Sequence, residues 1–153
     1  MTFCAISAAV SVNFYKDKLG MARINWLERL GWSEEHLEEL RNAGYAYIRQ
    51  GKYETALPFF EALAILLPDS SYDAQTLGAI YVQMNEPKKA IKYLDRALQL
   101  ETDHSPTLLN LCKAFFMMGK EQEGKKLAAV LAKDSNPFIS STASALLMAH
   151  GGT

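Results

Sequence analysis

Residues 44–68 read GYAYIRQGKYETALPFFEALAILLP, and this stretch carries a pattern that returns every 34 residues along the chain. The residues that define the pattern are Gly44, Tyr47, Gly51, Tyr53, Ala56, Phe60 and Pro68. One period later the matching residues are Gly78, Tyr81, Ala90, Leu94 and Ala97. After a second period the match is looser, and it comprises Leu111, Phe115, Gly119 and Leu131. A period of this length indicates stacked copies of one small structural unit.

A period of 34 residues is that of the tetratricopeptide repeat, in which each unit is a helix-turn-helix pair. It predicts an all-α fold with three repeats, at residues 37–70, 71–104 and 105–138, stacked in a short right-handed solenoid. We expect a helical segment at residues 1–36 before the repeats, and a capping helix with a tail at residues 139–153. Because stacked units present an extended concave surface, the period favours binding of another polypeptide over catalysis.

Turn-forming and small residues set the expected helix boundaries and crossings. The turns inside the three repeats are predicted at Gly51-Lys52, Asn85-Glu86 and Gly119-Lys120. Ser33 is the expected N-cap of the first repeat, since its hydroxyl can accept a bond from the first helical turn. Pro58 is expected to distort its helix slightly without breaking it. Cys112 and Gly124 stand where small residues pack one helix of the third repeat against the other.

Charge and residue types argue against several other classes of protein. With 16 basic and 17 acidic residues, the chain has a net charge of −1, which lacks the basic excess expected for binding nucleic acid or an anionic membrane. Cys4 and Cys112 lie far apart in the sequence, and the three histidines are dispersed, so neither a metal site nor a cofactor is expected. The acidic cluster at residues 34–39 contains no cysteine that could act as a nucleophile beside a base. We therefore predict a protein that is not an enzyme.

The N-terminal residues 3–12, FCAISAAVSV, form an apolar run of the length found in signal peptides. No Lys or Arg precedes the run, and the first basic residue is Lys16, so a secretory signal is the less favoured interpretation. Ten residues are too few to span a bilayer. The favoured interpretation is an apolar helix that packs on the first repeat or on a second copy of the chain. Translation from Met21, which would omit this run, is an open alternative.

The repeat phase also predicts which side chains line the concave groove, namely those of the first helix of each repeat that point away from the second. The predicted set is Arg41, Tyr45, Ile48, Arg49, Tyr72, Gln75, Ala79, Val82, Leu109, Lys113, Phe116 and Met117. Its aromatic, aliphatic and methionine side chains suit an apolar or amphipathic segment, and we expect Phe116 and Met117 to lie opposite the core. The basic members Arg41, Arg49 and Lys113 are expected to fix the direction in which that segment binds.

Residues 46–101, AYIRQGKYETALPFFEALAILLPDSSYDAQTLGAIYVQMNEPKKAIKYLDRALQLE, resemble the SycD/LcrH class of type III secretion chaperones. The nearest echoes are Gln50-Gly51-Lys52-Tyr53-Glu54 through Ala56, then Phe60-Glu61-Ala62-Leu63, and Leu77-Gly78 followed by Ala90-Ile91. This resemblance implies a bacterial cytoplasmic chaperone that keeps an apolar secreted client, of the translocator or gatekeeper type, soluble before export. It also implies the client as partner, with a homodimer or a second co-chaperone as further partners. A needle-subunit chaperone and a general scaffold for soluble proteins are the alternatives.

Overall fold

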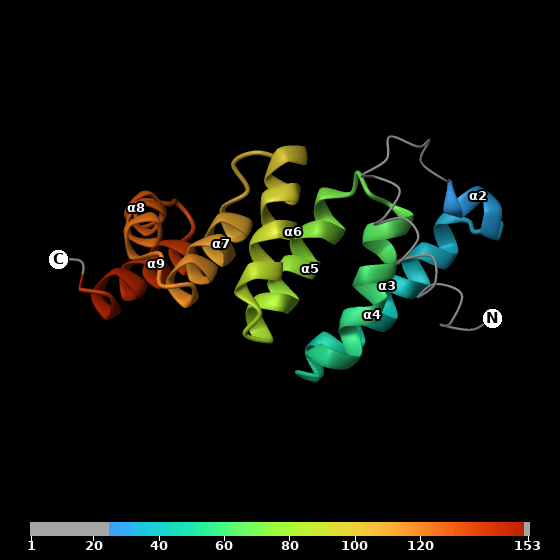
Figure 1. The fold of residues 1–153 in the computed structure, drawn as a ribbon, viewed down its shortest axis with the longest axis horizontal. Coiled ribbons are helices and arrows are strands. Elements are labelled where there is room, and N and C mark those ends of the chain that lie inside the picture. Colours follow the sequence, from blue (N-terminus) through green and yellow to red (C-terminus); the bar gives the residue numbers. More distant parts are fainter. Residues whose placement is uncertain (1–24, 152–153) are drawn as a thin grey trace. The chain divides into compact units, whose positions relative to one another are not determined.

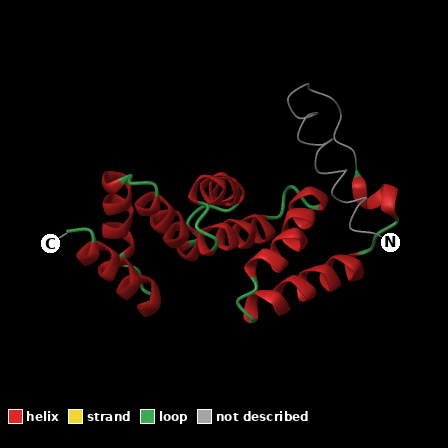
Figure 2. Cartoon of the chain, turned by 60° about the horizontal axis from the view of Figure 1, so that its bottom comes forward, coloured by secondary structure: helices red, strands yellow, loops and turns green. Residues whose placement is uncertain are grey.

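The computed structural model of the protein describes residues 25–151, and within them every regular element is an α-helix (Figures 1 and 2). The helices in chain order are α2 (Trp26–Leu30), α3 (Glu34–Arg49), α4 (Tyr53–Leu66), α5 (Ser71–Gln83), α6 (Pro87–Leu100), α7 (Ser105–Met117), α8 (Glu121–Leu131) and α9 (Pro137–Ala149). The predicted all-α class and its succession of helix pairs are confirmed. The apolar run at residues 3–12, Cys4 and Met21 lie outside the described residues.

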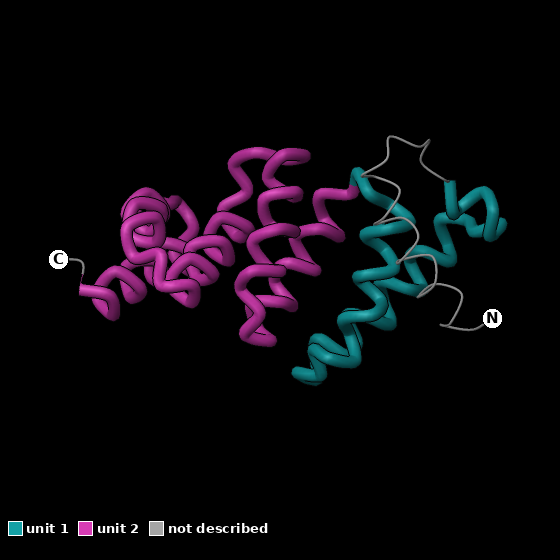
Figure 3. Tube along the Cα trace, in the orientation of Figure 1, with its two compact units in different colours: residues 1–69 teal, residues 70–153 magenta. Residues whose placement is uncertain are grey.

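The chain divides into two compact units, residues 1–69 and residues 70–153 (Figure 3). In the first unit, α3 packs against α4. In the second unit each helix from α5 to α9 packs against the next, and α7 also contacts α5 and α9. The helix α7 therefore lies at the centre of the second unit, in contact with four other helices.

The turns inside the repeats keep the 34-residue period in their backbone geometry. Gly51, Asn85 and Gly119 all have a positive φ, of 71°, 59° and 71°. The next residue in each turn donates its backbone N–H back into the preceding helix, as Lys52 does to Tyr47 O over 3.0 Å and Lys120 to Phe115 O over 2.9 Å. Glycine and asparagine tolerate this left-handed conformation, which is the usual way to end a helix at a tight turn. The three predicted turns are confirmed.

Helices α3 and α5 carry a glycine where each crosses its partner. A β-carbon on Gly44 would lie 2.6 Å from Cε2 of Phe60, and one on Gly78 would lie 2.6 Å from Cγ and Cδ2 of Leu94. Both distances are far below van der Waals contact, so a larger side chain would push the helices apart. The glycines therefore allow a large side chain of the second helix to lie directly on the backbone of the first.

The third pair reverses this arrangement of sizes. The residue 34 positions after Gly78 is Cys112, and the residue 34 positions after Leu94 is Ala128, and both are fully buried. The larger residue is thus on α7 and the smaller one on α8, which keeps the two helices close. The Cys112 thiol donates a hydrogen bond to Gly124 O at 3.4 Å, and burial raises its pKa to about 11, although Lys113 lowers it slightly. The thiol is therefore protonated near neutral pH, as expected for a packing role.

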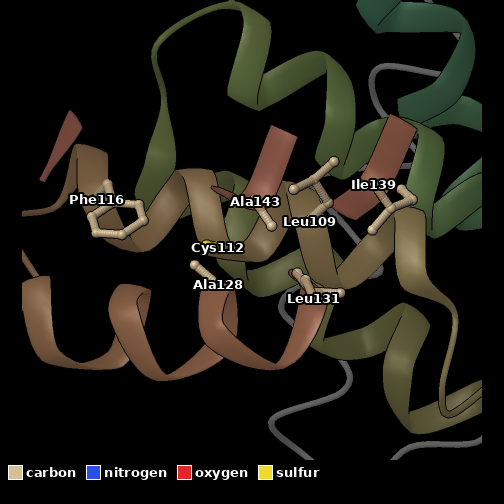
Figure 4. Packing of buried hydrophobic residues seen from close by; sticks show 7 residues of the cluster. All are labelled: Leu109, Cys112, Phe116, Ala128, Leu131, Ile139 and Ala143. Carbon is tan, nitrogen blue, oxygen red and sulfur yellow. The ribbon is translucent and has the colours of Figure 1, made fainter. Parts of the chain in front are cut away.

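A cluster of buried side chains joins α7, α8 and α9 (Figure 4). Its members are Leu109, Cys112, Phe116, Ala128, Leu131, Ile139 and Ala143. In Figure 4, Phe116 lies at one end of the cluster and Ile139 toward the other, so the core runs along the length of α7. The last two members belong to α9, which therefore closes the apolar side of the α7–α8 pair.

Several helix boundaries follow the predicted signals, and two differ slightly. Pro58 lies inside a continuous α4, as expected. The short first helix begins at Trp26, after the N-cap Asn25, whose side chain accepts a bond from Glu28 N–H. The last helix begins at Pro137, two residues before the expected Ile139. Its start is fixed by the side chain of Asn136, which accepts the backbone N–H of Phe138 at 3.0 Å.

Candidate binding surface

The twelve predicted groove residues lie on α3, α5 and α7, and most of them occupy repeat positions that recur every 34 residues. The recurring positions are Arg41, Gln75 and Leu109; Tyr45, Ala79 and Lys113; Ile48, Val82 and Phe116; and Arg49, Gln83 and Met117. Tyr72, at the start of α5, completes the set. Comparing exposure at equivalent positions shows which of them form surface and which form core.

The position shared by Ile48, Val82 and Phe116 belongs largely to the core. Ile48 is half-buried, whereas Val82 is only 7% exposed and Phe116 only 8%. The expectation that Phe116 points away from the core is therefore wrong. Its ring lies over Gly124, where an added β-carbon would come within 2.8 Å of Cε1, so α8 has made room for it.

A paired change in the sequence carries the signal for this burial. Val82 in the second repeat is matched by Phe116 in the third, while Ala90 is matched by Gly124. One side chain grows by an aromatic ring as its partner loses a methyl group. Two such opposite changes at residues that face each other indicate core packing, and repeat phase alone does not show it.

The position shared by Arg41, Gln75 and Leu109 is engaged inside the protein. Leu109 is 3% exposed and belongs to the α7–α9 core cluster, so it too is not a surface residue. Gln75 Oε1 accepts a hydrogen bond at 2.9 Å from the hydroxyl of buried Thr107. The guanidinium of Arg41 contacts the carboxylates of Glu38, at 2.5 Å, and Glu34, at 3.6 Å.

Five of the remaining side chains form what we call the α5–α7 face: Tyr72, Ala79, Gln83, Lys113 and Met117. The helices α5 and α7 contact each other within the second unit, so the face is a property of that unit alone. Tyr72 is 50% exposed and Met117 is 38% exposed. Ala79 between them is small and partly exposed, and Lys113 places one cationic side chain on the same helix as Met117.

The first unit presents the corresponding residues on α3. The Tyr45 ring packs edge-on against Phe60, with 5.1 Å between ring centroids, and is partly exposed. Arg49, in the last turn of α3, is exposed. These two side chains stand at the repeat positions of Lys113 and Met117, so the same positions form surface in both units.

The α5–α7 face offers apolar contact with a few polar groups at its edges. An aromatic ring and a flexible thioether can adapt to different apolar side chains, and Lys113 and Gln83 can bond to carbonyl or carboxylate groups. Among residues 25–151, no group of three or more His, Cys, Asp or Glu side chains is placed to hold a metal ion. None of the helices in that range is long and apolar enough to cross a membrane.

Comparison with known proteins gives one family and two groups of similar proteins. Residues 49–131, more than half of the chain, match the model of the family described as anaphase-promoting complex, cyclosome, subunit 3. Superkiller complex protein 3 of Mus musculus is 31% identical over 77 residues, which are 50% of this chain and 5% of that protein. The chain thus spans about a twentieth of the length of the curated relatives that it matches.

The similar solved structures are of secretion chaperones. The Yersinia enterocolitica type III secretion chaperone SycD, in complex with a peptide of the translocator YopD, has a TM-score of 0.70 and 22% identity, and the match covers 78% of this chain and 95% of that one. PcrH, in complex with the chaperone binding region of PopD, has a TM-score of 0.66 and 21% identity, over 79% of this chain and 95% of that one. At such identities the likeness shows that the fold is shared.

Proposed function

The chain belongs to the tetratricopeptide-type family described as anaphase-promoting complex, cyclosome, subunit 3, and on this premise we propose that it is a chaperone of a bacterial type III secretion system. It binds an apolar or amphipathic segment of a secreted client before export. The observation that carries the proposal is the shared fold with SycD and PcrH, both of which hold a segment of another protein in their solved complexes.

The α5–α7 face is the part of the surface that we propose contacts the client. Tyr72 and Met117 supply the apolar anchors, and Lys113 bonds to carbonyl or acidic groups of the segment, which fixes its direction. In the first unit, Tyr45, Ile48 and Arg49 extend the contact. Covering the segment removes its apolar surface from water, so the client neither aggregates nor pairs prematurely. The process involves no covalent step, and it takes place in the bacterial cytoplasm.

Among secreted clients, we favour a translocator over a gatekeeper or a needle subunit. The printed descriptions of SycD and PcrH name translocator YopD and the chaperone binding region of PopD as what those chaperones hold. The mixed surface described above, with two exposed apolar anchors among polar side chains, suits an extended segment with apolar residues at intervals. It suits a continuous apolar helix less well, because such a helix needs an uninterrupted groove.

A scaffold that joins soluble proteins is the second candidate function. It is favoured by the sequence likeness to Superkiller complex protein 3, which at 31% identity exceeds the identity to the chaperones. The two functions differ in the client: a chaperone holds one apolar secreted protein, whereas a scaffold holds several folded ones.

Changing Tyr72→Asp together with Met117→Asp is expected to lower the amount of client captured from lysate of the native cell by about 100-fold. The reason is that two apolar anchors, each worth about 1.5–3 kcal/mol when buried, are replaced by carboxylates that resist desolvation. Capture is measured by mass spectrometry of proteins bound to the immobilised chain. Both residues are exposed, so circular dichroism should show unchanged helical content.

The control for this variant carries Ala129→Asp and Val130→Asp, which add the same charge at two exposed residues of α8. It should capture the client as the unchanged chain does. If the Tyr72 and Met117 variant still captured the same single secreted protein at full yield, the α5–α7 face would not be the client site. Capture of several soluble proteins, indifferent to either variant, would favour the scaffold.

A further inference from the structure

The outer face of the last helix is exposed and carries no charge. The segment 137–149, PFISSTASALLMA, contains no Lys, Arg, Asp or Glu. On one side of α9, Ile139 and Ala143 are buried, at 2% and 0% exposure. On the other side, Phe138 is 67% exposed and Met148 is 77% exposed. Terminal elements of a repeat array ordinarily turn a polar face to solvent, so an uncharged face with two large apolar side chains requires an explanation.

The exposed side chains form one stripe along the helix, which we call the α9 outer face: Phe138, Ser141, Ala145 and Met148. At 100° per residue these four lie within about a quarter-turn of one another. Their sizes run large, small, small, large, and their spacings along the sequence are 3, 4 and 3 residues. This order reads almost the same from either end of the helix.

We propose that the α9 outer face binds the same face of a second copy of the chain, with the two helices antiparallel about a two-fold axis near Ala143. In that arrangement Phe138 of each copy lies against Met148 of the other, and Ser141 against Ala145. A two-fold interface requires that residue i contacts residue j while j contacts i, and the palindromic order satisfies this condition. The small residues at the centre let the helix backbones approach closely, while the large ones pack at both ends.

Charge favours a second copy over a different partner. Self-pairing sets every charge of a face against its own kind, so a face that pairs with itself must be uncharged or carry both signs in register. The α9 outer face has no charge at all, and it therefore offers nothing for the ion pairs that fix the orientation of a different partner. One helix pair covers less than the roughly 800 Å² per partner of a standard interface, so the dimer is weak and forms at high concentration.

Sedimentation velocity of the full chain, from about 5 µM to about 500 µM, is expected to show a monomer that becomes a dimer with a Kd on the order of 100 µM. Phe138→Asp should weaken the dimer by at least about tenfold, because two carboxylates enter the apolar contact. Tyr72→Asp, an equal change at an exposed residue of α5, should leave the association unchanged. A chain that stays monomeric throughout, or a dimer indifferent to Phe138→Asp, would overturn the proposal.

A charge exchange tests the antiparallel geometry itself. Phe138→Lys alone and Met148→Glu alone should each weaken the dimer, because each places a charge against an apolar side chain. The double variant should recover association to within about threefold of the unchanged chain, since each new cation then meets the new anion of the other copy. If the double variant associates as poorly as the single ones, the helices do not pair in this register. Binding of the client by these variants is expected to remain intact, which separates this interface from the α5–α7 face.

Discussion

Phe116→Asp is expected to abolish the cooperative unfolding of the α7–α9 helices, whereas Met117→Asp, at the next residue, should leave it nearly unchanged. The Phe116 ring is 8% exposed, lies over Gly124 and stacks on the His150 ring at 3.9 Å between centroids. A carboxylate there loses the ring's packing and has no partner for its charge. The expected loss in the free energy of unfolding is about 4 kcal/mol or more, a large share of the stability of a small protein. Met117 is 38% exposed, and an aspartate there remains in water.

Urea unfolding of both variants, followed by far-ultraviolet circular dichroism, gives the comparison. The prediction holds that Phe116→Asp loses helical signal in dilute buffer or at low urea, while Met117→Asp keeps the midpoint of the unchanged chain to within a few tenths of a molar unit of urea. Equal midpoints for the two variants would show that the Phe116 side chain faces solvent. The original expectation from the repeat phase would then be right after all.

Gly78→Val is expected to destabilise the second unit by about 3 kcal/mol. A β-carbon at residue 78 would lie 2.6 Å from Leu94 Cγ and 3.2 Å from the backbone nitrogen of Leu94. A side chain could rotate away, but the backbone of α6 can move only by separating from α5. Gln83→Val, at an exposed residue of the same helix, is the control, because it adds a β-branched side chain without touching α6. Thermal and urea unfolding measure the difference.

A second change identifies the cause of that loss. The third pair of helices combines Cys112 with Ala128, so Gly78→Cys together with Leu94→Ala reproduces its arrangement in the second pair. We expect this double variant to be more stable than the sum of the two single effects indicates, by about 1–2 kcal/mol. Strictly additive effects would mean that residues 78 and 94 do not compete for the same space.

The local features of the fold were predictable because neighbouring residues determine them. The turns at Gly51, Asn85 and Gly119 require a left-handed residue, and glycine and asparagine are the residues that adopt it readily. Helix starts at prolines follow from the missing N–H of that residue. The exposure of the groove residues was less predictable, because it depends on the size of a side chain on another helix. Val82 and Phe116 are buried since Ala90 and Gly124 leave space for them.

The roles of the histidines also depended on geometry beyond the sequence pattern. Each described histidine stands at a helix end. His36 Nδ1 accepts the backbone N–H of Ser33 at 3.0 Å, and His104 Nδ1 accepts that of Thr107 at 3.3 Å. His150, after the last turn of α9, contacts Glu121 at 3.1 Å. Histidine is an uncommon cap beside Ser, Thr, Asp and Asn, so spacing alone did not indicate these roles.

Site-specific photo-cross-linking in the native cell tests the proposed client site most directly. A benzophenone side chain is introduced at Met117, on the α5–α7 face, and separately at Val130, an exposed apolar residue of α8. The account predicts that the probe at residue 117 forms a covalent adduct with one secreted protein, and that the probe at residue 130 does not. An adduct with the secreted client from residue 130 but none from residue 117 would contradict it.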